Sequence, residues 1–151
     1  MKVIGKLVLM SAIMCLSSVL FTPEISAQDS PPKSSSEDSI NIQSTDYIRD
    51  GEASINKQDA DTVTGSCSTT SYSYVDRIHC EIYLQVWDEE NGTWEEAGVR
   101  EEFMNYDDNH VFGDTSFDVP KGFYYRFRSI HKTVHNGKIE VLTGTTPYVK
   151  M

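Results

Sequence analysis

Residues 75–87 read VDRIHCEIYLQVW, and this segment decides the fold class. Successive side chains of an extended chain point to opposite faces, so strict alternation of apolar and polar residues predicts a half-buried β-strand. The predicted buried face comprises Ile78, Cys80, Ile82, Leu84 and Val86. The predicted outer face presents Arg77, His79, Glu81, Tyr83, Gln85 and Trp87.

Two hairpins extend this pattern along the chain. Asn91-Gly92 follows the first strand and is typical of a tight hairpin turn, because both residues accept positive φ angles; a new strand then begins at Trp94. Residues 123–134 alternate again, and one of their faces carries Phe123, Tyr125, Phe127, Ser129 and His131. Asn136-Gly137 predicts the second hairpin, which returns through residues 138–143.

The strand count indicates the architecture. Segments 53–56, 62–67 and 115–119 raise the number of short alternating strands to about seven. Short strands with regular turn signals predict an all-β fold, a single two-sheet antiparallel sandwich like that of immunoglobulin and fibronectin III domains. Residues 95–104 are the one place where a short helix is an alternative.

Three segments of different composition divide the chain. Residues 1–27 have the order of an export signal, with two lysines, an apolar run and Ala27 at the cleavage position. That run is shorter than the roughly 20 apolar residues that span a membrane. We therefore expect a cleaved signal peptide and a secreted protein with no membrane span afterwards. Residues 28–48 are rich in Ser and Pro and predict a disordered linker. Residues 49–151 form the predicted sandwich domain of unknown function.

The net charge narrows the range of partners. Removal of residues 1–27 takes away two bases and one acid, so the formal net charge of −10 becomes −11. Such a charge argues against binding to nucleic acid or anionic membranes. Eleven acids and one base, Arg100, lie between Asp88 and Asp118. A weak calcium site is one hypothesis for this region, with ligands Asp88, Glu90, Asp107 and Asp108. The alternative is a solvated acidic loop with no bound ion.

The two cysteines after the signal, Cys67 and Cys80, both fall on predicted inward faces. In an oxidising exported setting this arrangement predicts a disulfide, which would stabilise the fold by about 3 kcal/mol. Two buried free thiols are the alternative. The sequence has no HExxH, CxxC or GxSxG motif, so we expect neither a cofactor nor an enzyme. A secreted hydrolase that uses carboxylates of residues 88–118 stays open as an alternative.

Aromatic and cationic residues share the outer faces of the two clearest strands. If segments 75–87 and 123–134 are neighbours, they form a surface that we call the stripe, composed of Tyr83, Trp87, Tyr124, Arg126 and Arg128. Such a surface suits a protein partner or a cell-wall glycan. In the alternative reading, the Arg stems merely cover the rings. We therefore predict a non-catalytic extracellular or cell-surface binding module; a purely structural surface protein is a further alternative.

Two resemblances accompany this reading. Residues 115–131, TSFDVPKGFYYRFRSIH, resemble the end of the fibronectin type III pattern, and Phe123 at the corner-tyrosine position implies a lost corner hydroxyl. The chain also resembles an uncharacterised family of small secreted β-sandwich proteins of Gram-positive bacteria. That resemblance rests on segments 75–78 (VDRI), 83–87 (YLQVW), Asn91-Gly92 and 122–131 (GFYYRFRSIH). It implies the fold and the compartment but no activity.

The calcium hypothesis is tested by comparing melting temperatures in calcium chloride and sodium chloride at matched ionic strength. The carboxylates of residues 88–118 repel one another, which raises their pKa values. Both salts weaken this repulsion by screening. We expect equal shifts, as for a solvated acidic face. A larger calcium shift that saturates would instead indicate a site among Asp88, Glu90, Asp107 and Asp108.

Overall fold

The structure is a computed structural model that describes Pro31 and residues 45–151. The predicted signal peptide and most of the predicted linker lie outside the described residues. The described residues include Thr45 to Ile48, a few residues before the predicted domain boundary at residue 49. The backbone of residues 46–48 is hydrogen-bonded to Glu140 of β5 (residues 138–145). Within the described part of the chain, no helix has the length and apolar character needed to cross a membrane.

The described residues form six β-strands. They are β1 (Ile48–Lys57), β2 (Thr62–Asp88), β3 (Thr93–Asp118), β4 (Tyr124–His135), β5 (Lys138–Thr145) and β6 (Val149–Lys150). The all-β prediction is therefore confirmed. The short helix considered for residues 95–104 is wrong, because this segment pairs with β2 as part of β3.

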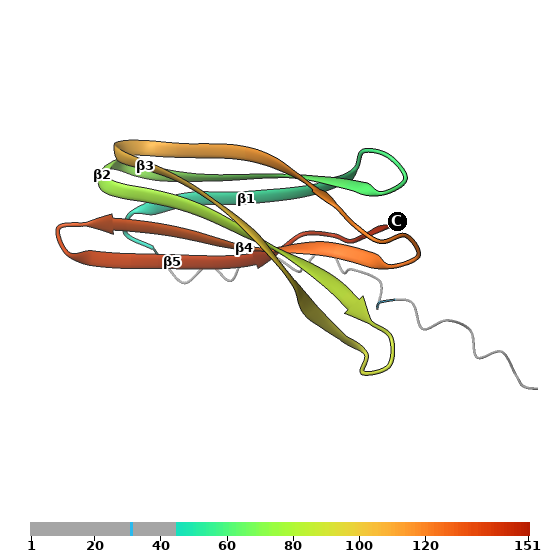
Figure 1. Cartoon of the computed structure of the whole chain (residues 1–151). Helices are drawn as coiled ribbons and strands as arrows, with labels where there is room; N and C mark the ends of the chain where they lie inside the picture. Colours follow the sequence, from blue (N-terminus) through green and yellow to red (C-terminus); the bar gives the residue numbers. More distant parts are fainter. Residues whose placement is uncertain (1–30, 32–44) are drawn as a thin grey trace, which may run out of the picture.

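All six strands belong to one curled sheet (Figure 1). Its order is β1-β2-β4-β5, with β3 on β2 and β6 on β4, and all of these strand pairs are antiparallel. The prediction of two sheets with about seven strands differs from this arrangement. The predicted strands at 62–67 and 75–87 are two halves of β2, and the predicted strands that begin at Trp94 and Thr115 are both parts of β3.

β2 changes neighbours halfway along its length. Its first half pairs with β1 and the end of β3, whereas its second half pairs with β4 and the start of β3. The ladder with β3 is interrupted between Thr70 and Val75, where the register shifts. Such irregularities bend a strand and increase its twist. The β2–β3 ribbon therefore folds back over itself, and its two halves face each other across the core.

The core lies between these two halves. The predicted inward residues of β2 are buried: Val63, Cys67, Ile78, Cys80, Ile82 and Leu84 are each no more than 1% exposed. The alternation is incomplete, because His79, Gln85 and Trp87, predicted on the outer face, are also buried, at 4%, 7% and 7% exposed. Phe127, at 0% exposed, enters the same cluster from β4. The Cys67–Cys80 disulfide is present, so that prediction is confirmed. It joins the two halves of one strand and thereby holds the bend closed.

Turn chemistry follows the sequence at one of the two predicted hairpins. In the first hairpin the loop has four residues, 89–92, and within it only Gly92 has a positive φ, of 65°. Asn136 and Gly137 both have positive φ angles, of 50° and 77°, as a two-residue hairpin loop requires. The expected loss of the corner hydroxyl is wrong. Tyr125, two residues after Phe123, donates its hydroxyl to the carbonyl of Pro120 at 3.0 Å, and burial raises the pKa of this phenol.

A carboxylate links the two free edges of the sheet. Glu140 of β5 accepts hydrogen bonds from the backbone N–H groups of Asp46, Tyr47 and Ile48, at 2.9, 2.8 and 3.2 Å. Lys138 lies 3.0 Å from the same carboxylate. Burial acts to raise the pKa of Glu140, but these bonds together outweigh it, so the pKa lies below its ordinary value. The start of β1 is thus attached to β5 without a strand pairing.

Glu140→Gln tests this link. The amide has one acceptor oxygen and no charge, so we expect a loss of about 1–3 kcal/mol in unfolding free energy at pH 7. A depressed folded-state pKa contributes stability that is present above the ordinary value of 4.5 and is lost as the pH falls through the folded-state pKa. The difference between wild type and variant should therefore shrink below pH 4.5. Urea unfolding over a range of pH measures it. Glu52→Gln, on the exposed side of β1, is the control, and equal effects of both variants would argue against the link.

Candidate functional site

The structure brings the predicted stripe together on one face of the sheet, but Trp87 and Tyr124 are buried there, at 7% and 9% exposed, so the accessible part is formed by the other members. Strands β2 and β4 are neighbours, with Tyr83 opposite Arg128 and Gln85 opposite Arg126. Residues directly opposite in an antiparallel pair project from the same side of the sheet. Segments 75–87 and 123–134 are therefore neighbours, as the predicted surface requires.

Each cation of the stripe lies over an aromatic ring. The guanidinium of Arg128 lies 4.2 Å from the ring centre of Tyr83, and that of Arg126 lies 4.5 Å from the ring of Trp94. Arg126 Nε donates to Gln85 Oε1 at 2.9 Å, and Arg128 forms an ion pair with Glu96. The Arg stems cover the rings, as the alternative reading expected. The contacts also hold both guanidinium planes in place.

The stripe includes three residues beyond those predicted from the sequence: Trp94, Tyr148 and Lys150. Trp94 packs edge-on against Trp87, with 5.4 Å between the ring centroids. The ring centroid of Tyr148 lies 6.1 Å from that of Trp94 and 5.5 Å from that of Tyr124. Lys150 lies 4.8 Å from the ring of Tyr124. The predicted two-residue loop at Asn91-Gly92 would place Trp94 opposite Glu89, whereas the observed four-residue loop, residues 89–92, places it opposite Trp87. Tyr148 and Lys150 follow the last long strand, and no alternation pattern marks them.

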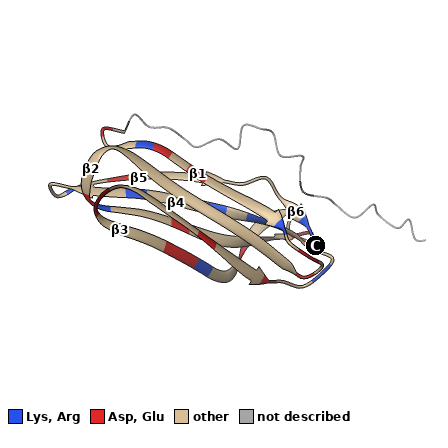
Figure 2. Ribbon diagram, turned by 90° about the horizontal axis from the view of Figure 1, so that it is seen from above, with Lys and Arg blue, Asp and Glu red and all other residues tan. Residues whose placement is uncertain are grey.

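Charge differs between the two strands that pair with β2 from either side, β3 and β4 (Figure 2). Acidic residues are frequent along β3, whereas β4 carries Arg126, Arg128 and Lys132. Within residues 77–87, 94–106, 124–134 and 150, the pairing registers assign six bases and three acids to the outer face. They are Arg77, Arg100, Arg126, Arg128, Lys132 and Lys150, with Glu81, Glu96 and Glu102. A locally basic surface therefore lies on an acidic protein.

The four residues of the calcium hypothesis do not come together. Asp88 and Glu90 lie at the β2–β3 turn, whereas Asp107 and Asp108 lie near the bend, where Asp108 pairs with Val75. A strand rises about 3.3 Å per residue, so roughly 40 Å of ribbon separates the two pairs. Hydrogen bonds from the Asn91 side chain and backbone lower the pKa of Asp88, opposite to the rise expected from like charges.

A histidine and two glutamates form a second cluster on the outer face. His79, Glu81 and Glu102 offer ligand atoms within 4.8 Å of one another. His79 Nδ1 lies 2.7 Å from Glu102 Oε1, and Tyr83 donates its hydroxyl to Glu81 Oε2 at 2.7 Å. A cation on Nδ1 would move the ring proton to Nε2, which is buried without a partner. We therefore interpret this cluster as a hydrogen-bonded network.

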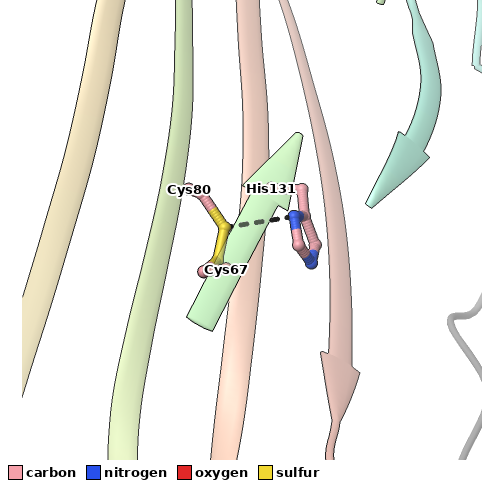
Figure 3. A group of neighbouring side chains, drawn as sticks. All are labelled: Cys67, Cys80 and His131. Atoms are coloured by element: carbon pink, nitrogen blue, oxygen red, sulfur yellow. Dashed lines mark hydrogen bonds between the residues drawn. A yellow bond between two sulfur atoms is a disulfide. The ribbon is translucent and has the colours of Figure 1, made fainter. Parts of the chain in front are cut away.

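A third cluster lies at the centre of the core (Figure 3). His131 of β4 points at the disulfide, and its Nδ1 is 3.4 Å from Cys80 Sγ. Thr69 Oγ1 lies 2.9 Å from the same nitrogen and donates its single proton to the carbonyl of His79. Nδ1 must therefore carry the ring proton, and Nε2 accepts from Ser129 Oγ at 3.1 Å.

The surroundings of His131 fit a neutral imidazole. Burial lowers its pKa to about 4, against smaller opposing effects of the Ser68 backbone and Asp50. Gly51 of β1 leaves room for the ring, because a Cβ at this position would come within 2.5 Å of it. Sequence alternation predicted the inward direction of His131, but its contact with the disulfide depends on how β2 folds back.

A groove of about 500 Å³ adjoins this core cluster. Its lining includes Gly51 and Ser129, which both touch the His131 ring, and Ala53, which pairs with Cys67. The groove is separate from the stripe, because none of the stripe residues lines it. It offers the closest approach from the surface to the buried cysteines and histidine among the grooves described.

Fold and surface together define an all-β domain with a locally basic, ring-supported outer face. The chain belongs to a family of unknown function, DUF6147, whose model matches residues 22–149. A search of curated proteins finds no match.

The low pKa of His131 predicts acid sensitivity. The unfolded chain takes up the proton near pH 6.5 and the folded protein only near pH 4, so stability is full above pH 6.5 and is lost as the pH falls towards 4. The expected loss is on the order of 3 kcal/mol. Chemical denaturation from pH 4 to 7.5 measures it. His131→Gln should remove this slope and the exposed-site control His110→Gln should keep it; an unchanged slope in His131→Gln contradicts the assignment.

Proposed function

We propose that this protein is an exported, non-catalytic binding module that uses the stripe to contact an extracellular protein or a cell-wall glycan. The observation that carries the proposal is the pair of cation–π contacts, Arg126 over Trp94 and Arg128 over Tyr83. Guanidinium groups that lie over a ring and are hydrogen-bonded have little freedom left to lose, so a partner binds them at a lower entropic cost. Arg, Trp and Tyr are also the residues that dominate binding energy at protein interfaces.

The charge distribution limits the kind of partner. The protein as a whole carries a net charge of −10, so it repels polyanions at long range. The basic face acts at short range, where a guanidinium pairs with a carboxylate in two parallel hydrogen bonds. A partner that presents isolated carboxylates on a largely neutral surface fits both facts. The resemblance of residues 115–131 to the fibronectin type III pattern supports the same kind of role.

Sedimentation with purified cell-wall sacculi and capture of exported proteins on immobilised protein test the proposal. Wild-type protein should bind one of the two, and Arg126→Gln with Arg128→Gln should weaken that binding at least about tenfold. The matched control is Arg49→Gln with Lys121→Gln, two exposed bases away from the stripe. This control has the same net charge as the test variant and should bind like wild type.

Two results would contradict the proposal. Equal losses in both double variants would indicate attraction by net charge alone. Absence of binding to both preparations at high micromolar concentration would remove the case for a binding module. Thermal melting of each variant shows whether the fold is retained.

A further inference from the structure

The core cluster has the composition of a metal site. Cys67 and Cys80 come from the two halves of β2 and His131 comes from β4, and all three are no more than 1% exposed. Their two sulfurs and one imidazole nitrogen lie within 4.8 Å of one another (Figure 3). We propose that, when the disulfide is reduced, Cys67, Cys80 and His131 bind a single zinc-class cation, and that this ion and the disulfide exclude each other.

The geometry requires only small movements. Zinc takes thiolate sulfur at about 2.3 Å and imidazole nitrogen at about 2.0–2.1 Å, so two sulfurs on one tetrahedral ion lie roughly 3.8 Å apart. The Cα atoms of Cys67 and Cys80 are 6.0 Å apart. Rotation about the two Cα–Cβ bonds can therefore separate the sulfurs once the bond between them is broken. His131 Nδ1 already faces Cys80 Sγ at 3.4 Å.

Two neighbouring hydroxyls complete the surroundings. When Nδ1 binds a metal, the ring proton sits on Nε2, and Ser129 Oγ at 3.1 Å is placed to accept it. Metal-bound histidines generally have such a partner on the second nitrogen. Thr69 Oγ1 lies 2.9 Å from Nδ1, so it is the hydroxyl that a metal on this nitrogen would displace or contact. The same pocket thus satisfies His131 in both of its neutral forms.

The charge balance favours a divalent ion. Two thiolates cancel the two positive charges of the cation, and the imidazole is neutral, so the complex adds no net charge to the core. A neutral site avoids the large cost of burying an uncompensated charge. The groove lined by Gly51, Ala53 and Ser129 provides the approach from solvent.

Metal binding first requires reduction of the Cys67–Cys80 disulfide to two thiols. A phosphine reductant transfers two electrons to the disulfide and becomes a phosphine oxide, with water supplying the oxygen and the two protons of the thiols. Binding of the metal then releases two protons, one from each thiol. In the reverse direction, a glutathione-type disulfide oxidises the two thiols and is itself reduced to two thiols.

Cobalt(II) titration of the phosphine-reduced full chain tests the site, because cobalt replaces zinc and reports thiolate ligands by charge-transfer absorption. We expect one cobalt per chain, tetrahedral visible bands and displacement by zinc. The oxidised protein is the internal control and should show no such band. A reduced protein that stays folded but shows no cobalt–thiolate absorption overturns the proposal. If reduction alone unfolds the chain, zinc should restore the fold, and failure to restore it also overturns the proposal.

Two further measurements separate a metal site from two cysteines that bind cobalt loosely. His131→Gln should weaken cobalt binding by at least about tenfold and change the visible spectrum, whereas His110→Gln should do neither. Zinc should also slow reoxidation of the reduced wild-type chain by oxidised glutathione. If His131→Gln binds like wild type, or zinc leaves the reoxidation rate unchanged, the assigned ligand set is wrong. None of these readouts depends on the stripe, so failure here leaves the proposed function separately testable.

Discussion

Residues 71–75 turn β2 from one side of the core to the other, and every other strand takes its position from this bend. Before it, β2 pairs with β1; after it, β2 pairs with β4, while β3 follows β2 on the opposite edge throughout. A hydrogen-bonded ribbon that folds over itself brings two of its own surfaces face to face. The Cys67–Cys80 disulfide connects these surfaces directly, so a single covalent bond holds the closed arrangement.

The centre of this small core is unusually polar, and its polar groups depend on one another. Thr69, Ser129 and His131 are almost completely buried, yet each side chain has a hydrogen-bond partner. A fully satisfied buried network favours one arrangement of the strands over alternatives, since any shift of register leaves polar groups without partners. Gly51 contributes to the same arrangement by leaving space for the imidazole. The proposed metal site makes use of groups that the fold already brings together.

Exposed charge has two distinct roles on the surface. In the described structure β3 pairs with β2 alone, so its second edge carries unpaired backbone groups, and its many acidic side chains oppose pairing with another chain. The bases of β4 instead lie over rings from β2 and β3, where the contacts immobilise them. Glu140 performs a third task, because it satisfies three backbone N–H groups where β1 and β5 approach without pairing.

The sequence by itself determined the strand character, most of the buried positions, the places of both hairpins, the turn geometry of the second one and the cysteine pair. These features depend on side-chain alternation and on local turn preferences, which neighbouring residues decide. Alternation does not reveal whether two consecutive strands belong to one bent strand, so the continuity of β2 and β3 was decided by tertiary structure. The same limit explains the outcome for Asp88 and Asp108. Both belong to the acidic segment 88–118, but their carboxylates lie at opposite ends of the β2–β3 ribbon segment that joins the turn to the bend. The contacts of His131 with the disulfide and of Tyr148 with the stripe join residues distant in the chain, and only the folding of the sheet brings them together.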